Sequence, residues 1–163
     1  MLPKIIIGSD HAGFVLKEKL KGYLAKKKFA VTDVGTFTLD SCDYPDFVQA
    51  LASPIVKKKF LRGIFICKSG IGSAIAANKF PGIRAALCYH SAAARLSREH
   101  NDSNVLVLGA AFVSTAEAKK IVSVWLRTEF CGGRHKRRLN KIKKIEKKLI
   151  IGKELKRETH TSY

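Results

Sequence analysis

Short apolar runs alternate along this chain with longer amphipathic segments, and the pattern repeats five times. The apolar runs cover residues 4–8, 30–34, 63–67, 83–89 and 105–108. Runs of this kind, rich in Val and Ile, are typical of strands that are buried on both faces. The segments between them are long enough to cross over and join parallel strands. The alternation therefore predicts a three-layer α/β/α sandwich with a five-stranded parallel sheet, a Rossmann-like arrangement.

The connecting segments predict helices. Their apolar side chains recur at near-helical spacing among lysines and other polar residues. The expected helices cover residues 13–28, 46–59, 92–98 and 115–130, and residues 70–79 are expected to form a loop that opens into a helix. Pro54 is expected to kink or split the second of them, and Ser114 or Thr115 is expected to cap the last.

The C-terminal part of the chain is far more basic than the rest. Residues 134–163 hold 12 basic and 3 acidic side chains, out of 31 and 13 in the whole chain. Leu139, Ile142, Ile145 and Leu149 recur at spacings of three and four, which predicts a helix over about 134–150 with a narrow apolar stripe. We expect a single domain over residues 1–150, whose last helix docks on a partner subunit through this stripe. The polar tail over residues 151–163 is expected to be disordered.

Composition excludes several classes of protein. Of the 163 residues, 46% are hydrophobic and 27% charged, which excludes a wholly disordered chain, a collagen and a disulfide scaffold. The four cysteines form no C-x-x-C pair and no cluster with the five histidines, so we expect no metal site and free thiols in a reducing compartment. The N-terminal apolar run is too short for a signal peptide, and no apolar run is long enough to span a bilayer. We therefore expect a cytoplasmic protein.

Polar, reactive residues lie at three places around the predicted sheet. They are Ser9–His11 after the first strand, Cys67–Ser73 after the third, and residues 100–102 before the fifth. Because ligands of open parallel sheets bind beyond the strands' carboxyl ends, we expect these groups to contribute to one site. Each signal alone is weak. A lone cysteine at the end of a buried strand usually packs as a small apolar side chain, and a His-Asn pair in a loop is more often a turn or a cap.

The segment after the third strand is the most informative of the three. Cys67 directly precedes a Ser-Gly-x-Gly loop that opens a predicted helix. Unpaired amides and the positive dipole end of a helix stabilise a thiolate, and they also bind an oxyanion or a phosphate. Glycines let the backbone approach a ligand closely. The segment is not a P-loop, because the order Gly-x-x-x-x-Gly-Lys-Ser/Thr is absent.

Seven motifs in order carry a resemblance to a known family. They are residues 8–14 (GSDHAGF), 43–46 (DYPD), 66–72 (ICKSGIG), 75–79 (IAANK), 82–85 (GIRA), 96–102 (LSREHND) and 132–135 (GGRH). With these motifs the chain closely resembles the type B ribose-5-phosphate isomerases, a family shared with allose- and galactose-6-phosphate isomerases. The resemblance covers about residues 4–150.

The resemblance implies an enzyme that interconverts ribose 5-phosphate and ribulose 5-phosphate, an aldose and a ketose, through an enediolate. It implies no metal ion and no organic cofactor. The family's site lies in a cleft between two subunits, so a homodimer or a dimer of dimers is expected. No membrane partner is expected.

The resemblance also implies roles for individual residues. Cys67 matches the base that moves a proton between sugar C2 and C1, and His100 matches the residue that opens the furanose ring. Ser69, together with the backbone of the glycine-rich loop, matches the donors that stabilise the enediolate. The remaining matches are Asp10, counted with the catalytic residues, then His11, Tyr44 and Asn101 for the sugar, the loop residues Lys68, Gly70, Ile71 and Gly72 for the substrate, and Arg134 and Arg138 for the phosphate.

Two departures from the family pattern leave other functions open. Lys68 stands where the family usually has glycine after the catalytic cysteine, and Ala111 stands where it often has a phosphate-binding arginine. These departures motivate two alternatives: a non-catalytic sugar-phosphate-binding paralogue, and an isomerase of a six-carbon sugar phosphate such as allose or galactose 6-phosphate.

A third alternative is that the basic tail attracts phosphate polymers or a membrane surface. We expect no nucleic-acid partner, because the apolar stripe needs a packing surface and base-stacking aromatic residues are absent from the segment.

Overall fold

The computed structural model describes residues 3–158, with side chains for residues 3–151. The chain divides into two compact units, Met1–Phe130 and Cys131–Tyr163. The elements of the first unit are β1 (Lys4–Ser9), α1 (Phe14–Lys26), β2 (Ala30–Asp33), α2 (Tyr44–Val56), β3 (Gly63–Cys67), α3 (Ile71–Ala77), β4 (Ala85–Leu87), α4 (Ser91–Asn101), β5 (Val105–Gly109) and α5 (Thr115–Arg127). The second unit contains α6 (Gly133–Glu158).

The sheet has five parallel strands in the order β2-β1-β3-β5-β4. Gly63 pairs with Val105 at one end of β3, and Cys67 pairs with Gly109 at the other. Parallel pairing of this kind requires helical crossovers between successive strands, and each of the five strands is followed by a helix. The predicted parallel sheet and the α/β/α layering are therefore confirmed.

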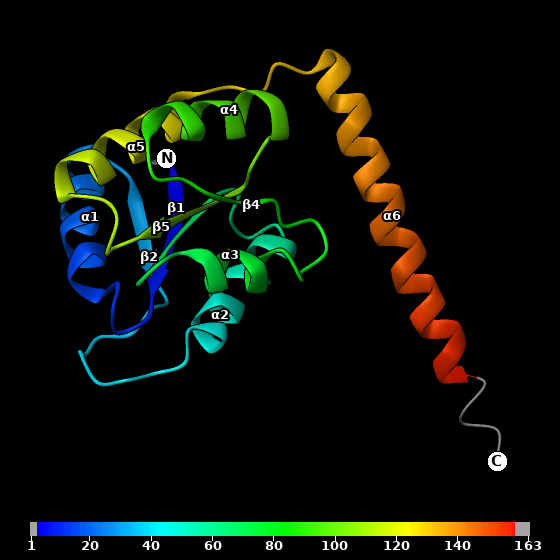
Figure 1. Cartoon of the computed structure of the whole chain (residues 1–163), viewed down its shortest axis with the longest axis horizontal. Helices are drawn as coiled ribbons and strands as arrows, with labels where there is room; N and C mark the ends of the chain where they lie inside the picture. The colour runs from blue at the N-terminus through cyan, green and yellow to red at the C-terminus, as the bar shows by residue number, and fades with distance from the viewer. Residues whose placement is uncertain (1–2, 159–163) are drawn as a thin grey trace. The chain divides into compact units, whose positions relative to one another are not determined.

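Two apolar clusters fill the space between the sheet and its helices. One cluster joins α1, α4 and α5 to one face of the sheet and contains Leu20, Trp125 and Ile66. The other joins α2 and α3 to the opposite face and contains Leu51 and Phe65. Successive side chains of β3 enter opposite clusters, which explains why this strand is apolar throughout. Figure 1 shows the sheet between these two groups of helices.

The connections after β1 and β3 leave the sheet in opposite directions. β1 leads into α1 on one face, and its neighbour β3 leads into α3 on the other. At such a switch point the two loops separate and leave a crevice beyond the carboxyl ends of the strands. This topology predicts the crevice between the loop after Ser9 and the loop after Cys67.

Two elements differ from the prediction. β4 is shorter than expected, because the amides of Ile83 and Arg84 donate to Phe80 and to the Asn104 side chain instead of to a strand. α2 is one helix with Pro54 inside it, and it is not split. Pro54 lies in the last turn, where its missing amide removes only one helical hydrogen bond.

α6 extends further than the predicted range of 134–150 and ends at Glu158. Gly152 does not end the helix, because a single glycine costs only about 1 kcal/mol relative to alanine and good helix formers follow it. The part of the expected disordered tail up to residue 158 is thus helical, and residues 159–163 lie outside the described residues. None of the helices within residues 3–158 is long and apolar enough to cross a membrane.

Candidate active site

Cys67 is the last residue of β3, and its side chain is only 4% exposed. The amide of Gly70 donates a hydrogen bond to its Sγ at 3.1 Å. Gly70 has a φ of 82°, a backbone conformation that favours glycine, and a Cβ built on it would press against the end of the Leu87 side chain. This hydrogen bond and the conformation of Gly70 hold the Cys67 sulfur in place at the carboxyl end of β3.

The backbone of this loop is fixed by β5 and by the end of β4. The amides of Ala110 and Ala111 donate to the carbonyls of Cys67 and Lys68 at 2.9 and 3.0 Å. Tyr89 Oη donates to the Ser69 carbonyl at 2.9 Å, and Ser69 Oγ accepts from the Ile71 amide at 3.2 Å. Four hydrogen bonds thus order the chain directly after the sulfur.

Lys68 adopts its position without backbone strain. Among residues 3–158, the non-glycine residues with positive φ are Lys28, Lys58 and Asp102, so Lys68 does not occupy a glycine conformation. Its side chain is exposed. Lys68 therefore places an exposed cation next to Cys67 in the sequence without adopting a backbone conformation that requires glycine.

The loop after β1 lies on the other side of the crevice. Asp10 is 5% exposed, its Oδ1 accepts from the Gly13 amide at 2.9 Å, and its amide donates to the Ile66 carbonyl at 3.3 Å. His11 Nδ1 accepts from the Cys42 amide at 3.2 Å. An accepting Nδ1 carries no proton, so the neutral ring has its proton on Nε2 and can donate from there.

Tyr44 reaches the same loop from α2. A Cβ on Gly72 would lie 2.6 Å from Tyr44 Oη, so the ring fits against the loop only because residue 72 is glycine. The structure therefore brings together Asp10, His11 and Tyr44 with the segment from Cys67 to Gly72.

Two buried hydroxyls at this site belong to segments that the sequence analysis singled out, but it gave neither of them a role. Ser9 and Ser73 are 0% exposed, and their Oγ atoms have no hydrogen-bond partner among the described residues. Ser9 ends β1 beside Ile66, and Ser73 lies in the first turn of α3. A buried hydroxyl without a partner costs about 1–3 kcal/mol, so such groups are rare without a functional reason. Their place in the motifs was visible in the sequence, but their burial was not.

A buried ion cluster supports the loop between β2 and α2, which carries Cys42. Lys17 is 0% exposed, and its Nζ lies 2.6 Å from Asp33 Oδ2 and donates to the Thr36 carbonyl at 2.8 Å. The Thr36 amide in turn donates to the Ser9 carbonyl. Burial raises the pKa of Asp33, but the hydrogen bonds from Lys17 and Lys21 outweigh it and hold this pKa below its ordinary value.

His100 and Asn101 do not lie beside Cys67 within one chain. They form the last turn of α4, and Arg84 Nε donates to the Asn101 carbonyl at 3.0 Å just before β4 begins. They therefore lie at the amino end of the strands, about 13 Å along β5 from the carboxyl end. The expectation that they share the carboxyl edge is wrong for a single chain, because a helix that precedes a parallel strand ends at that strand's beginning.

Arg134 and Arg138 belong to the second unit. Both are exposed in the first turns of α6, four residues apart and hence on one face of the helix. Their contact with a phosphate stays a prediction. Among the side chains that the structure describes, no group of three or more His, Cys, Asp or Glu residues is placed to hold a metal ion.

Comparisons with known proteins agree with this geometry. Residues 5–142 match the family model described as Ribose/Galactose Isomerase. Ribose-5-phosphate isomerase B of Escherichia coli is 42% identical over 147 residues, which are 90% of this chain and 99% of that protein.

Solved structures are similar over the same range. Ribose-5-phosphate isomerase B of Clostridium thermocellum has a TM-score of 0.88 at 51% identity and covers 90% of this chain and 99% of its own. The Mycoplasma genitalium enzyme with bound ribulose-5-phosphate has a TM-score of 0.87 at 42% identity, covering 90% and 98%. The match over nearly the whole chain, with the fold and the cysteine loop described above, makes this chain a member of the ribose/galactose isomerase family.

Proposed function

We propose that this protein is an isomerase that interconverts ribose 5-phosphate and ribulose 5-phosphate without a cofactor. The observation that carries the proposal is Cys67, held at the crevice with the Gly70 amide on its sulfur. The relatives named above are ribose-5-phosphate isomerases, and one of them was solved with ribulose-5-phosphate.

In the proposed reaction Cys67 removes the proton from C2 of the open-chain aldose and returns it to C1. The hydroxyl proton on the C2 oxygen moves to the C1 oxygen, so the atoms balance without an oxidant or reductant. The enediolate between these steps carries negative charge on its oxygens. Ser69 and the amides of the loop are the donors closest in sequence to the base, and they stabilise this charge.

The other sugar contacts come from the opposite side of the crevice. Asp10 and the Nε2–H of His11 bind hydroxyl groups, and Tyr44 closes the site from α2. Ser9 and Ser73 supply the two buried hydroxyls that have no partner among the described residues. Lys68 places a positive charge next to Cys67 in the sequence.

We infer that two copies of the chain form one site, because His100 lies at the amino end of the strands and Cys67 at the carboxyl end. In a homodimer, His100 and Asn101 of a second copy complete the crevice, and His100 transfers a proton to the ring oxygen to open the furanose. The apolar stripe of α6 docks on that copy, and Arg134 and Arg138 bind the phosphate. Localisation in the cytoplasm stays a prediction.

Replacing Cys67 by Ala tests the proposal. We expect kcat to fall by roughly 10²–10⁴-fold, the usual contribution of a general base, and exchange of the C2 proton with solvent to stop. Cys131→Ala is the matched control, because this cysteine is exposed and lies outside the first unit. Proton exchange at the wild-type rate in Cys67→Ala would rule out the assigned base.

Turnover of ribose 5-phosphate measured beside allose and galactose 6-phosphates decides the substrate class. A higher kcat/KM for the pentose phosphate supports the proposal, and a higher value for either hexose phosphate contradicts it. Absence of turnover on all three would identify a non-catalytic paralogue.

A further inference from the structure

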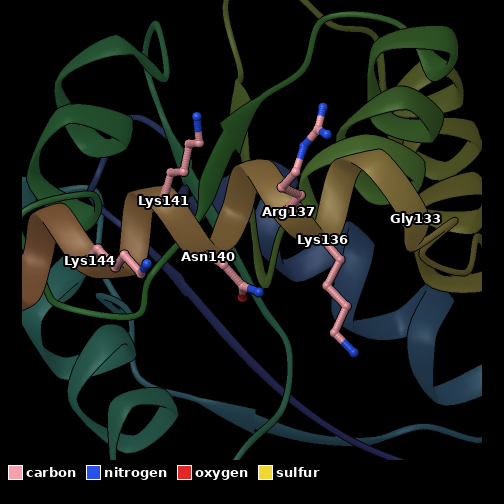
Figure 2. Close-up of a pocket in the computed structure, with 6 residues that line it drawn as sticks. All are labelled: Gly133, Lys136, Arg137, Asn140, Lys141 and Lys144. Carbon is pink, nitrogen blue, oxygen red and sulfur yellow. The ribbon is translucent and has the colours of Figure 1, made fainter.

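One side of α6 carries a continuous set of cations. Gly133, Lys136, Arg137, Asn140, Lys141 and Lys144 border a groove of about 430 Å³. Figure 2 shows the side chains of Lys136, Arg137, Asn140, Lys141 and Lys144 extending separately from this stretch of the helix. The intervals of three and four residues place all of them on one side of the helix, and exposed Lys147 and Lys148 continue the same side. We call Lys136, Arg137, Lys141, Lys144, Lys147 and Lys148 the basic face.

The basic face and the apolar stripe lie on nearly opposite sides of α6. At about 100° per residue, the directions of Leu139, Ile142, Ile145 and Leu149 average roughly 150° away from those of the basic face. Docking of the stripe on another surface therefore leaves the cations exposed to solvent. Docking of the stripe and phosphate binding by the cations, which are alternatives from the sequence alone, are therefore compatible on this helix.

The charge on this face is not balanced within the helix. Glu146 is the one acidic residue in the sequence between residues 131 and 151, against nine Lys and Arg. Arg137 and Lys141 are four residues apart, as are Lys144 and Lys148, and like charges at this spacing repel. The last three lysines of the face, beginning at Lys144, also lie beyond residue 142, where the match to the family model ends. The positive charge of the basic face is therefore not explained by the family's reaction, and a polyanion bound from outside the chain would balance it.

The side chains of α6 indicate which kind of polyanion it would bind. Residues 133–151 contain no Phe, Tyr or Trp, so α6 offers bases no stacking platform, which binding of single strands uses. It also lacks the aromatic anchors that are common in helices bound at a membrane surface. The basic face extends about 18 Å from Lys136 to Lys148. This length suits the regular line of phosphates along a duplex, which carries one charge per about 1.7 Å.

We propose that the basic face of α6 binds the phosphate backbone of a nucleic-acid duplex without reading its sequence. This second binding site is independent of Cys67 and of the proposed isomerase activity. Contacts to phosphate alone position a protein on a duplex and carry no base information, in agreement with a face made almost entirely of lysine.

The test is a fluorescence anisotropy titration of the full-length protein with labelled 20-base-pair duplexes, one of DNA and one of RNA, at several salt concentrations. With about four phosphate contacts, the logarithm of the affinity should fall with the logarithm of salt with a slope of about −3.6, and so by roughly 100-fold between 50 and 200 mM. Equal affinity for unrelated sequences is expected. Which of the two duplexes binds more tightly identifies the natural form.

The variant Lys141→Gln/Lys144→Gln should lose at least about tenfold in duplex affinity and reduce the slope by about 2, while isomerase activity stays unchanged. Lys57→Gln/Lys59→Gln is the matched control, because it removes the same charge from exposed lysines at the end of α2. Equal losses in both variants would show attraction by net charge alone and overturn the proposal. Tighter binding to phosphatidylserine vesicles, or to single strands, than to either duplex would also overturn it.

Discussion

At the scale of single residues, the proposed site contains buried polar atoms that have no hydrogen-bond partner within the described part of the chain. Ser97 and Ser73 show the contrast. Ser97 Oγ donates to the Ala94 carbonyl at 2.8 Å and lies 2.9 Å from Ser103 Oγ, whereas Ser73 Oγ has no partner among the described residues. Both hydroxyls are buried, so the first stabilises the fold and the second is available to a ligand.

Replacing Ser73 by Ala should therefore stabilise the free protein and weaken catalysis. Removal of the unpartnered hydroxyl is expected to raise the free energy of unfolding by up to about 1 kcal/mol, and the lost substrate contact should lower kcat/KM by roughly 2–10-fold. Urea unfolding and steady-state kinetics measure the two effects. Ser97→Ala, the matched variant, should lower stability by about 1 kcal/mol and leave kcat/KM unchanged. A loss of stability in Ser73→Ala would show that its hydroxyl has a structural partner.

At the scale of elements, the loop between β2 and α2 depends on an ion cluster below it. Lys17 of α1 is fully buried and contacts Asp33 at the end of β2. The ring centroids of Phe14 and Phe37 lie 5.3 and 4.7 Å from Lys17 Nζ. Lys21 Nζ lies 2.7 Å from the same Asp33 oxygen, and its hydrogen bond to Asp33 raises the pKa of Lys21. The cluster therefore ties a helix, a strand and a loop of the site together through one carboxylate.

Replacing Asp33 by Asn should destabilise the fold by roughly 3 kcal/mol at neutral pH, because it leaves the buried Lys17 ammonium with only the exposed Glu18 carboxylate, at 3.3 Å, as a counter-charge. The folded-state pKa of Asp33 is lowered from 3.8, so this carboxylate stabilises the fold above that value and loses its effect as pH falls below it. The stability difference between wild type and variant should thus be constant above about pH 5 and shrink below about pH 4. Urea unfolding across this pH range is the measurement. Asp40→Asn, an exposed change in the same loop, should stay within about 0.5 kcal/mol of wild type, and a similar loss in both variants would contradict the role of the cluster.

At the scale of the whole molecule, the proposed site requires two copies of the chain. Cys67 and His100 lie at opposite ends of the strands of one sheet, so no side-chain rearrangement within a chain unites them. Closed twofold symmetry gives two equivalent sites in a dimer, each with one Cys67 and one His100 from different copies.

Mixing two inactive variants tests this arrangement. Cys67→Ala and His100→Ala should each be nearly inactive alone. When they are unfolded and refolded together, half of the dimers are mixed and each mixed dimer has one intact site, so activity should return to about a quarter of wild type. Isomerase assays before and after mixing measure the recovery. No recovery, with mixed dimers confirmed by a tag on one variant, would place both residues of a site in the same copy.

The sequence by itself determined the layers, the parallel sheet and the identity of the cysteine loop. These depend on local patterns: apolar runs of β-branched residues, helical spacing, and the glycines of the loop directly after Cys67. Tertiary structure decided the order of the strands and the edge to which each polar residue belongs. The sequence-based prediction placed His100 at the wrong end of the sheet, because a motif identifies a reactive side chain but not the end of the strands at which it lies. That end is set by the strand that follows α4 in the sheet. Burial of Ser73 and Lys17 also depends on packing between distant segments. The identity of a serine or a lysine in the sequence does not show whether its side chain is exposed to solvent or buried in the core.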